Sequence, residues 1–220
     1  MPVDQRGERR KSSELLALVL GAVRAPIPSP NRIAPAVAHR ADGVPEGDDW
    51  LHEIEVVGLR MMAHKRGREV YFVGVGGDDW TADLAGLAPR IADVRADEVI
   101  FDGCVVARDT TGLGEREALR SELAGVGSGL ELVAFDMIYL EGWDLRAAAL
   151  ADRKSLLREV LQRGSAGVHY ADHVVGNGPR CFETSRKLGV GGIVSKRVAS
   201  RYSGDLSRDW RVIKCVRNGA

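Results

Sequence analysis

The amino-acid sequence predicts an α+β domain in which antiparallel strands form most of the core and helices are inserted irregularly. Short apolar, β-branched segments follow one another with turn residues between them, whereas helical spacing occurs at only a few places. With 220 residues, 45% of them apolar and 28% charged, the chain is long enough for one well-packed globular domain, or for one domain with a tail.

The first 30 residues are predicted to lie outside this domain as a tail or linker. Arg9-Arg10-Lys11 precede an apolar run from Leu15 to Leu20, an order that also occurs in export signals. Acidic residues interrupt this stretch and no small-x-small cleavage site follows it, so we expect a short helix or a loose tail in a cytoplasmic protein. No run approaches the ~20 apolar residues of a membrane span. An extended linker is predicted from three prolines, Pro26, Pro28 and Pro30.

The first strands of the domain are predicted in two places. Residues 50–57 and 69–75 are apolar and β-branched, and the basic, glycine-containing stretch between them predicts a β-hairpin. Residues 99–101 and 105–107 form either a pair of strands or one strand that bends at Gly103.

The second half of the chain mixes helices and strands without a regular order. Residues 151–164 are predicted to be a helix, because Leu156, Leu157, Val160 and Leu161 form one apolar face and a glycine suited to a C-cap ends it. The other predicted elements are helices at 116–123 and 182–188, a buried strand at 132–140, and strands that contain Ile193-Val194 and Val212-Ile213.

The charge distribution leaves a nucleic-acid partner open. Basic and acidic residues both number 31, so no global cationic field attracts DNA. Between Ser195 and Ala220, however, seven basic residues stand against only Asp205 and Asp209. This segment is either a solvated strand and tail or a surface that contacts DNA phosphates. Its basic residues are Lys196, Arg197, Arg201, Arg208, Arg211, Lys214 and Arg217.

The cysteine and histidine residues do not form a metal-binding pattern. Cys104, Cys181 and Cys215 are scattered and lack the short spacing of zinc sites, which favours free thiols in a reducing cytoplasm. His169 and His173 lie four residues apart, but the residues around them lack a helical pattern. We therefore expect no metal-binding pair there.

One nine-residue segment carries the most specific signal. His52-Glu53-Ile54-Glu55-Val56-Val57-Gly58-Leu59-Arg60 resembles the nucleotidyl-transfer motif of ATP-dependent DNA ligases, in particular the bacterial ligase D type, where the pattern runs His-Glu-Ile-Lys-x-Asp-Gly-x-Arg. Five of the seven specified positions match. The two that differ are Glu55, where the family has the lysine that bonds to AMP, and Val57, where it has an acid.

Five further segments resemble the same family and follow in the family's order. Together with the motif they cover roughly residues 30 to 215. The resemblance implies an adenylation domain, an ATP-grasp-like nucleotidyltransferase built on antiparallel sheets, over residues 31–216. It also implies tails at 1–30 and 217–220 and a chain that ends before the C-terminal OB barrel. The five segments are Gly77–Thr81, Phe101–Ala107, Ala134–Gly142, Gly191–Arg197 and Ser207–Cys215.

The resemblance implies ATP and Mg²⁺ as the family's cofactors, and it implies that this chain has lost residues that use them. In the family a lysine attacks the α-phosphate, whereas Glu55 offers a carboxylate of the opposite charge. Carboxylates hold the metal, whereas Cys104 and Gly191 occupy two of their positions. Val75 and Val212 stand where the family has basic residues. We therefore expect a pseudoenzyme, with the absence of any cofactor as one alternative.

Five residues persist at positions that the resemblance assigns to the nucleotide. Glu53 is implied to contact the adenine, Arg60 the ribose or a phosphate, and Phe135 to stack on the base, while Lys196 and Lys214 face phosphates. Each has a structural alternative. Phe135 is a plausible core residue, Glu53 and Arg60 can form a surface pair, and Lys196 can be solvated.

Three functional interpretations remain open. The first is a catalytically inactive ligase-like domain, linked by ancestry to DNA repair and recombination, that contacts DNA through the basic segment or binds a repair protein. The second is an active nucleotidyltransferase whose surrogate nucleophile is Lys65, Lys196 or Lys214. The third is a protein-interaction domain without a nucleotide site. Some residues are expected to serve mainly the fold, through tight bends, hydrogen bonds at strand ends and a core plug; they are Gly58, Asp102, Gly103, Asp136 and Trp210.

Overall fold

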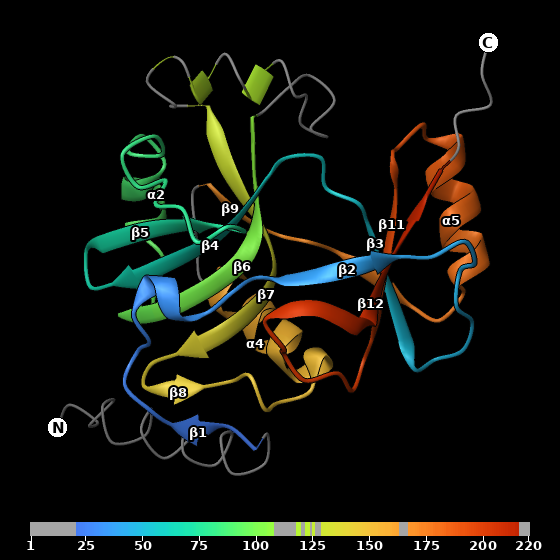
Figure 1. Cartoon of the computed structure of the whole chain (residues 1–220), viewed down its shortest axis with the longest axis horizontal. Helices are drawn as coiled ribbons and strands as arrows, with labels where there is room; N and C mark the ends of the chain where they lie inside the picture. Colours follow the sequence, from blue (N-terminus) through green and yellow to red (C-terminus); the bar gives the residue numbers. More distant parts are fainter. Residues whose placement is uncertain are drawn as a thin grey trace, which may run out of the picture.

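Two β-sheets lie next to each other, one on the left and one on the right of Figure 1. The computed structural model describes residues 21–107, 118–119, 122–123, 125, 129–162 and 167–215. Most strand pairs are antiparallel and the helices are few and irregularly placed, so the predicted α+β class is confirmed.

The first sheet has seven strands: β1 (Val23–Arg24), β4 (Leu59–Arg66), β5 (Glu69–Gly74), β6 (Glu98–Ala107), β7 (Leu130–Leu140), β8 (Trp143–Asp144) and β9 (Val168–Tyr170). Their order is β1-β8-β7-β6-β4-β5, and β9 pairs with β7. All neighbours are antiparallel except β7 and β9.

The second sheet has five strands: β2 (Ala36–Arg40), β3 (Trp50–Ile54), β10 (His173–Val175), β11 (Gly192–Arg197) and β12 (Asp205–Lys214). Their order is β10-β3-β11-β12-β2. Only β12 and β2 run parallel to each other.

The helices pack against the sheets from different sides. They are α2 (Ala88–Ala92), α4 (Leu150–Gln162) and α5 (Gly178–Lys187), with the short 3-10 helix η1 (Pro30–Arg32). Helix α5 packs against β3, β10 and β11 at the right of Figure 1. Helix α2 packs against β4 and β5, and α4 packs against β7 and β9.

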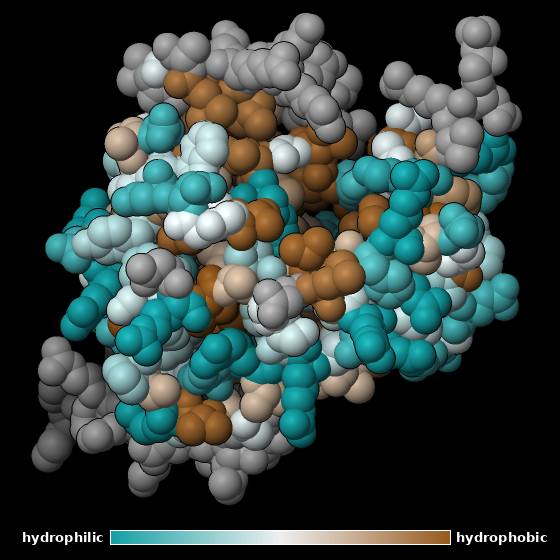
Figure 2. Space-filling view, viewed as in Figure 1, coloured by the Kyte–Doolittle hydropathy of each residue, from teal (hydrophilic) through white to brown (hydrophobic). Residues whose placement is uncertain are grey.

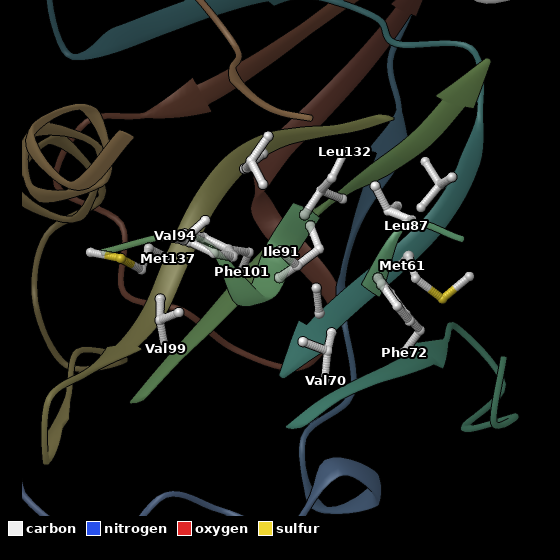
Figure 3. Packing of buried hydrophobic residues seen from close by; sticks show 14 of the residues in the cluster. Met61, Val70, Phe72, Leu87, Ile91, Val94, Val99, Phe101, Leu132 and Met137 are labelled. Carbon is white, nitrogen blue, oxygen red and sulfur yellow. The ribbon is translucent and has the colours of Figure 1, made fainter. Parts of the chain in front are cut away.

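Two apolar clusters form the core. The larger one joins α2 and α4 to the first sheet, and Figure 3 shows Ile91 among the side chains of β4, β5, β6 and β7. The smaller cluster brings together Leu51 and Trp210 of the second sheet with Met62 and Phe135 of the first. It therefore packs the two sheets against each other.

The predicted hairpin of residues 50–57 with 69–75 is wrong in its first strand. The hairpin joins β4 to β5, with a turn at Gly67 in a left-handed conformation (φ +59°). Residues 50–54 instead form β3, which pairs with β10 and β11 in the second sheet. The chain crosses between the sheets at residues 55–58. The side-chain pattern of β3 and β5 does not show that these two strands belong to different sheets, and β4 carries too many basic residues to stand out as a strand.

Residues 98–107 form one strand, which confirms the bent-strand alternative. The register of β6 against β7 shifts between Ile100 and Phe101 and again between Asp102 and Gly103. At Gly103 a Cβ atom would lie 2.4 Å from the carbonyl oxygen of Val133, so only glycine permits this approach.

Several other predicted elements are found close to their expected bounds. Helix α4 covers most of the predicted range 151–164, and β7 and α5 begin earlier than predicted. Three of the four predicted apolar positions of α4 are buried, and Leu156 is half-buried. The glycine predicted as the cap of α4, and four of the eight residues of the predicted helix 116–123, lie outside the described residues; residues 118–119 and 122–123 of that range are helical.

The described part of the predicted N-terminal linker is attached to the first sheet. Strand β1 pairs with β8, and the amide of Ala25 donates to the carbonyl oxygen of Gly142. The apolar run 15–20 and the tail 217–220 lie outside the described residues. Within the described ranges, no helix is long and apolar enough to cross a membrane.

Candidate functional site

The first residues of the nine-residue motif point alternately to the two faces of the second sheet. His52 faces the start of α5, and its Nδ1 lies 2.8 Å from Oγ of Ser195 on β11. Glu53 and Glu55 point the other way, towards the first sheet. Strand alternation therefore places only Glu53 and Glu55 in the region between the two sheets, which is called the crevice below. The side chains that meet Glu53 and Glu55 there, or lie next to those that do, are Arg60, Phe135, Lys154, Lys196 and Lys214.

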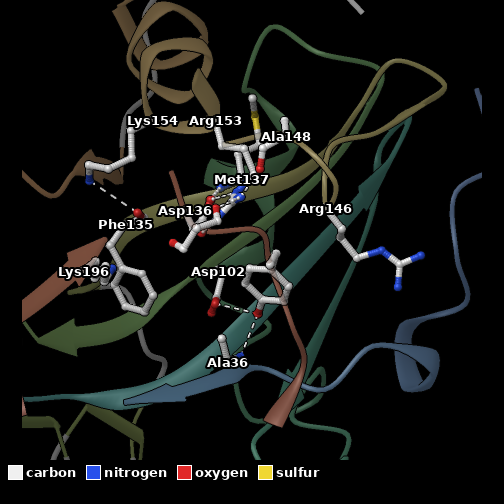
Figure 4. A network of polar contacts seen from close by, with 12 residues as sticks. Ala36, Asp102, Phe135, Asp136, Met137, Arg146, Ala148, Arg153, Lys154 and Lys196 are labelled. Carbon is white, nitrogen blue, oxygen red and sulfur yellow. Dashed lines mark hydrogen bonds and ion pairs between the residues drawn. The ribbon is translucent and has the colours of Figure 1, made fainter. Parts of the chain in front are cut away.

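Glu53 is buried deep in this crevice between two lysines. Its carboxylate lies 2.5 Å from Nζ of Lys154 and 2.6 Å from Nζ of Lys196. Lys154 also donates to the carbonyl oxygens of Ala171 and Phe135, and Figure 4 shows its bond to Phe135. Burial raises the pKa of Glu53, but the two lysines outweigh this effect and hold the pKa below its ordinary value.

Lys196 is enclosed rather than solvated, so the solvated alternative is wrong. It is 1% exposed, and its ammonium group lies 4.1 Å from the ring centroid of Phe135 and 4.0 Å from that of Trp210. The two rings meet edge to face. Burial lowers the pKa of Lys196, and Lys154 lowers it further, while Glu53 opposes this shift. Phe135 is a core residue, and its ring also forms cation–π contacts with Arg60 and Lys196.

Lys154 was not predicted, although the sequence contains a signal for it. Leu150, Arg153, Lys154, Leu157 and Leu161 recur at the spacing of one helix face, and all five are buried. Two charged residues on the apolar face of a helix require buried partners, which indicates an internal ion-pair site.

Arg60 lies across the crevice and pairs with Asp102 rather than with Glu53, so the proposed surface pair is wrong. Its guanidinium forms a two-pronged ion pair with Asp102, with 2.7 Å between Nη2 and Oδ2, and donates to the carbonyl oxygen of Ala36. It stacks 4.4 Å from the ring centroid of Phe135. The Tyr202 hydroxyl donates to the same carboxylate. Arg60 is therefore bound to the domain's own groups.

Asp136 and Arg153 form a second buried pair that holds the fold. Arg153 Nε and Nη2 each lie 2.8 Å from the Asp136 carboxylate, and both side chains are fully buried. Arg153 also donates to the carbonyl oxygens of Ala148 and Ser200. Asp102 and Asp136 have the structural role that was expected, but both lie inside strands rather than at strand ends.

Glu55 lies at the rim of the crevice, where its Oε1 is 2.5 Å from Nζ of Lys214. Its Oε2 is buried and has no hydrogen-bond partner within the described part of the chain. A Cβ atom at Gly191 would lie 3.7 Å from this oxygen and 4.0 Å from Cγ2 of Val57. Three positions that differ from the ligase pattern, residues 55, 57 and 191, thus lie together.

The donors at the expected metal positions do not suit Mg²⁺. Burial raises the pKa of the Cys104 thiol to about 11, so this group is neutral near pH 7. Gly191 has no side chain, and Glu55 is already paired with Lys214. Mg²⁺ prefers several oxygen ligands in octahedral geometry. Among the described residues, no group of three His, Cys, Asp or Glu side chains lies close enough to hold a metal ion.

The basic C-terminal segment is only partly available to a partner. Lys196 is buried, Lys214 is paired, and Arg197 pairs with Asp49 and lies 3.7 Å from Asp209. Arg201 and Arg208 are exposed, and residue 217 lies outside the described residues.

The remaining histidine and cysteine residues lie at separate places in the structure. His169 lies 3.0 Å from Glu131, whereas His173 lies 3.0 Å from the Tyr170 hydroxyl, so the two histidines do not share a site. The three cysteines are free thiols, as expected, with Cys104 buried. An open pocket of about 500 Å³ lies beside α4 and β9, and its lining includes Arg158 and Tyr170.

The surface above the crevice is apolar in its middle. Figure 2 shows hydrophobic side chains gathered between the two halves of the visible face, with hydrophilic ones on its flanks. Val212 contributes to the inner side of β12, between Trp210 and Lys214, and is paired in register with Val194. Valine therefore occupies a position where the resemblance implies a phosphate-binding lysine.

Comparison with known proteins agrees with this arrangement. A family model described as "ATP dependent DNA ligase domain" matches residues 34–215. The "Multifunctional non-homologous end joining protein LigD" of Pseudomonas aeruginosa is 32% identical over 190 residues, which are 86% of this chain and 22% of that protein. The LigD protein of Mycobacterium tuberculosis is 28% identical over 173 residues, 78% of this chain and 22% of its own length.

A solved structure supports the same assignment. The "mycobacterial DNA ligase D complexed with ATP and MES" is 27% identical, with a TM-score of 0.75, over 84% of this chain and 60% of that one. The chain spans about a fifth of the length of these curated relatives. It belongs to the ATP-dependent DNA ligase family and is a ligase-like adenylation domain of the LigD type.

Proposed function

We propose that this adenylation domain does not form the covalent AMP adduct and acts as a pseudoenzyme. The observation that carries the proposal is Glu55, a carboxylate at the position where the family's lysine attacks ATP, held in an ion pair with Lys214. A carboxylate repels the triphosphate, and the mixed anhydride that it could form with AMP is too labile for an ordinary ligase intermediate.

The lysines that could replace the nucleophile are all engaged. Lys196 is enclosed by Glu53 and two aromatic rings, and Lys214 is bound to Glu55. Lys65 lies on the other side of the first sheet, where it donates to the carbonyl oxygen of Ala96. A surrogate lysine would have to leave its carboxylate and lose a proton before it could attack, which disfavours an altered nucleotidyltransferase.

We propose that the residues of the nucleotide pocket are vestigial. Glu53, Arg60, Phe135, Lys196 and Lys214 stand at the positions that the resemblance assigns to the base, ribose and phosphates, but Lys196 is now paired with Glu53, Arg60 with Asp102 and Lys214 with Glu55. Phe135 contacts both Arg60 and Lys196. ATP can bind only by breaking these pairs. The Mg²⁺ that the family uses lacks a fitting set of ligands, so we derive no step through it.

The relatives' names connect them with non-homologous end joining, and we propose a role of this chain at DNA ends or with a repair protein in the cytoplasm. Arg201 and Arg208 are two exposed basic residues of the C-terminal segment, and they support phosphate contact. Because such contacts release counterions, binding to nicked duplex DNA should weaken as salt rises. An Arg201→Gln/Arg208→Gln variant should reduce this binding in a gel-shift assay.

The first test is incubation of the purified chain with α-³²P-labelled ATP and Mg²⁺ or Mn²⁺, followed by a denaturing gel. We expect no labelled band from protein that melts cooperatively, while an active ligase D labels under the same conditions. We also expect no label and no sealing of a nicked duplex from Glu55→Lys, because residues 104 and 191 still lack carboxylates. A labelled wild-type band would refute the pseudoenzyme, and its position would be mapped first at Lys196 and Lys214.

A further inference from the structure

Every cation that faces the described crevice is matched by a carboxylate of the same domain. Glu53 forms ion pairs with Lys154 and Lys196. Asp102 pairs with Arg60, and Glu55 pairs with Lys214. A phosphate entering the crevice must therefore compete with an anion that is covalently part of the protein and already in place.

The four cations differ in how accessible they are. The side chains of Lys154 and Lys196 are 1% and 2% exposed, so they are closed to ligands. The side chain of Arg60 is 21% exposed, but its partner Asp102 is fully buried. Lys214 is 47% exposed and its partner Glu55 is 20% exposed. The rim pair is thus the place where an anion from solution can meet a crevice cation after the smallest rearrangement.

Glu55 fits the space of a bound anion. One oxygen holds Lys214, while the other is buried beside the start of β11, where a Cβ at Gly192 would lie only 2.9 Å away. Arg60 and Lys196 lie 4.4 Å and 4.1 Å from the centroid of the same Phe135 ring, so two further cations lie near each other in the crevice. A carboxylate and a phosphate oxygen offer the same hydrogen-bond acceptor to an ammonium group.

We infer that Glu55 is an internal anion that fills the phosphate-facing part of the crevice and determines its specificity by excluding phosphate ligands from Lys214. This inference rests on the proposed function, in which the site is vestigial. It adds that a carboxylate of the protein itself occupies the site, and that the site has not merely lost ligand-binding residues. Removing the charge of Glu55 alone should create an anion site.

The test is calorimetric titration of the full chain with inorganic pyrophosphate, which cannot adenylate the protein. We expect Glu55→Gln and Glu55→Ala to bind pyrophosphate at least about tenfold more tightly than wild type, the size expected for one charge-assisted contact. Adding Lys214→Met to Glu55→Gln should abolish the gain. Thermal melts identify which variants fold, and two different residues at position 55 ensure that one misfolded variant does not decide the result.

A surface ion pair provides the matched control. Glu183 on α5 lies 2.8 Å from Arg186 and 3.8 Å from Lys187, so Glu183→Gln also releases cations, but on an exposed helix. It should bind pyrophosphate as wild type does. Equal binding by wild type and both position-55 variants, or an equal gain in Glu183→Gln, would overturn the inference. A labelled AMP adduct would overturn the proposed function instead, so the two failures are distinguishable.

Discussion

The floor and the rim of the crevice hold the same kinds of charge in different surroundings. At the floor, Glu53 lies between two lysines, and all three side chains are almost fully buried. At the rim, Glu55 and Lys214 form a single pair that is open to water. Water screens the rim pair, whereas the floor charges depend entirely on their partners. Evolution can therefore change the rim at little cost in stability, while the floor is tied to the fold.

The largest effect is expected at the floor. Glu53→Gln leaves Lys154 and Lys196 buried without a counter-charge and should lower the free energy of unfolding by about 3–5 kcal/mol. Lys154→Met should cost less, because Glu53 keeps Lys196 as its partner. Urea unfolding of both variants checks this order. Equal losses would mean that packing, rather than charge balance, decides stability at the floor.

The next largest effect concerns His64, a buried group outside the crevice pairs. His64 is 2% exposed, neither of its ring nitrogens has a hydrogen-bond partner among the described residues, and burial lowers its pKa to about 4 from 6.5. Between these values the unfolded chain binds more protons than the folded one. Stability contributed by neutral His64 is therefore present above pH 6.5 and is lost as the pH falls through 4, by about 3 kcal/mol in total.

This pH dependence is measured by urea unfolding at pH 7, 5.5 and 4. His64→Leu should remove this part of the acid sensitivity, so that the variant gains stability relative to wild type as the pH falls. If the difference between them is the same at all three pH values, His64 is not the group that titrates.

A smaller effect tests the neighbourhood of the rim pair. Gly191→Glu places a second carboxylate beside Glu55 and should lower stability by about 1 kcal/mol through repulsion in a partly exposed setting. Gly191→Gln has nearly the same shape without the charge and should cost less. In the Glu55→Lys background the order should reverse, and Gly191→Glu should be more stable than Gly191→Gln because the new carboxylate lies beside a lysine. A double-mutant cycle measures this coupling energy.

The smallest stability effect is expected from Glu55→Gln itself. A half-exposed ion pair contributes about 0–1 kcal/mol, so its melting temperature should stay close to that of wild type. A loss comparable to that of Glu53→Gln would show that the rim pair is as essential to the fold as the floor, and would remove the contrast between the two regions.

Much of the fold could be predicted because local pattern carries it. The apolar face of α4 and the run of β7 both follow from side-chain periodicity, and both are found close to their predicted bounds. The hairpin was mispredicted because β4 carries several basic residues among its apolar ones and was not recognised as a strand, and because periodicity does not assign a strand to a sheet. Of the site, the replacement of the nucleophile at residue 55 was visible in the sequence, whereas Lys154 was not recognised.

The sequence by itself determined the family, the order of its segments and the chemistry missing at positions 55, 104 and 191, because these depend only on which residue stands where. Only the tertiary structure decided which charge neutralises which. Lys154 and Glu53 are 101 residues apart in the sequence, and Lys214 and Glu55 are 159 residues apart, yet each pair is in contact. Coulomb energy depends on distance through space and on exposure to water, and both arise only when the two sheets and α4 close around the crevice.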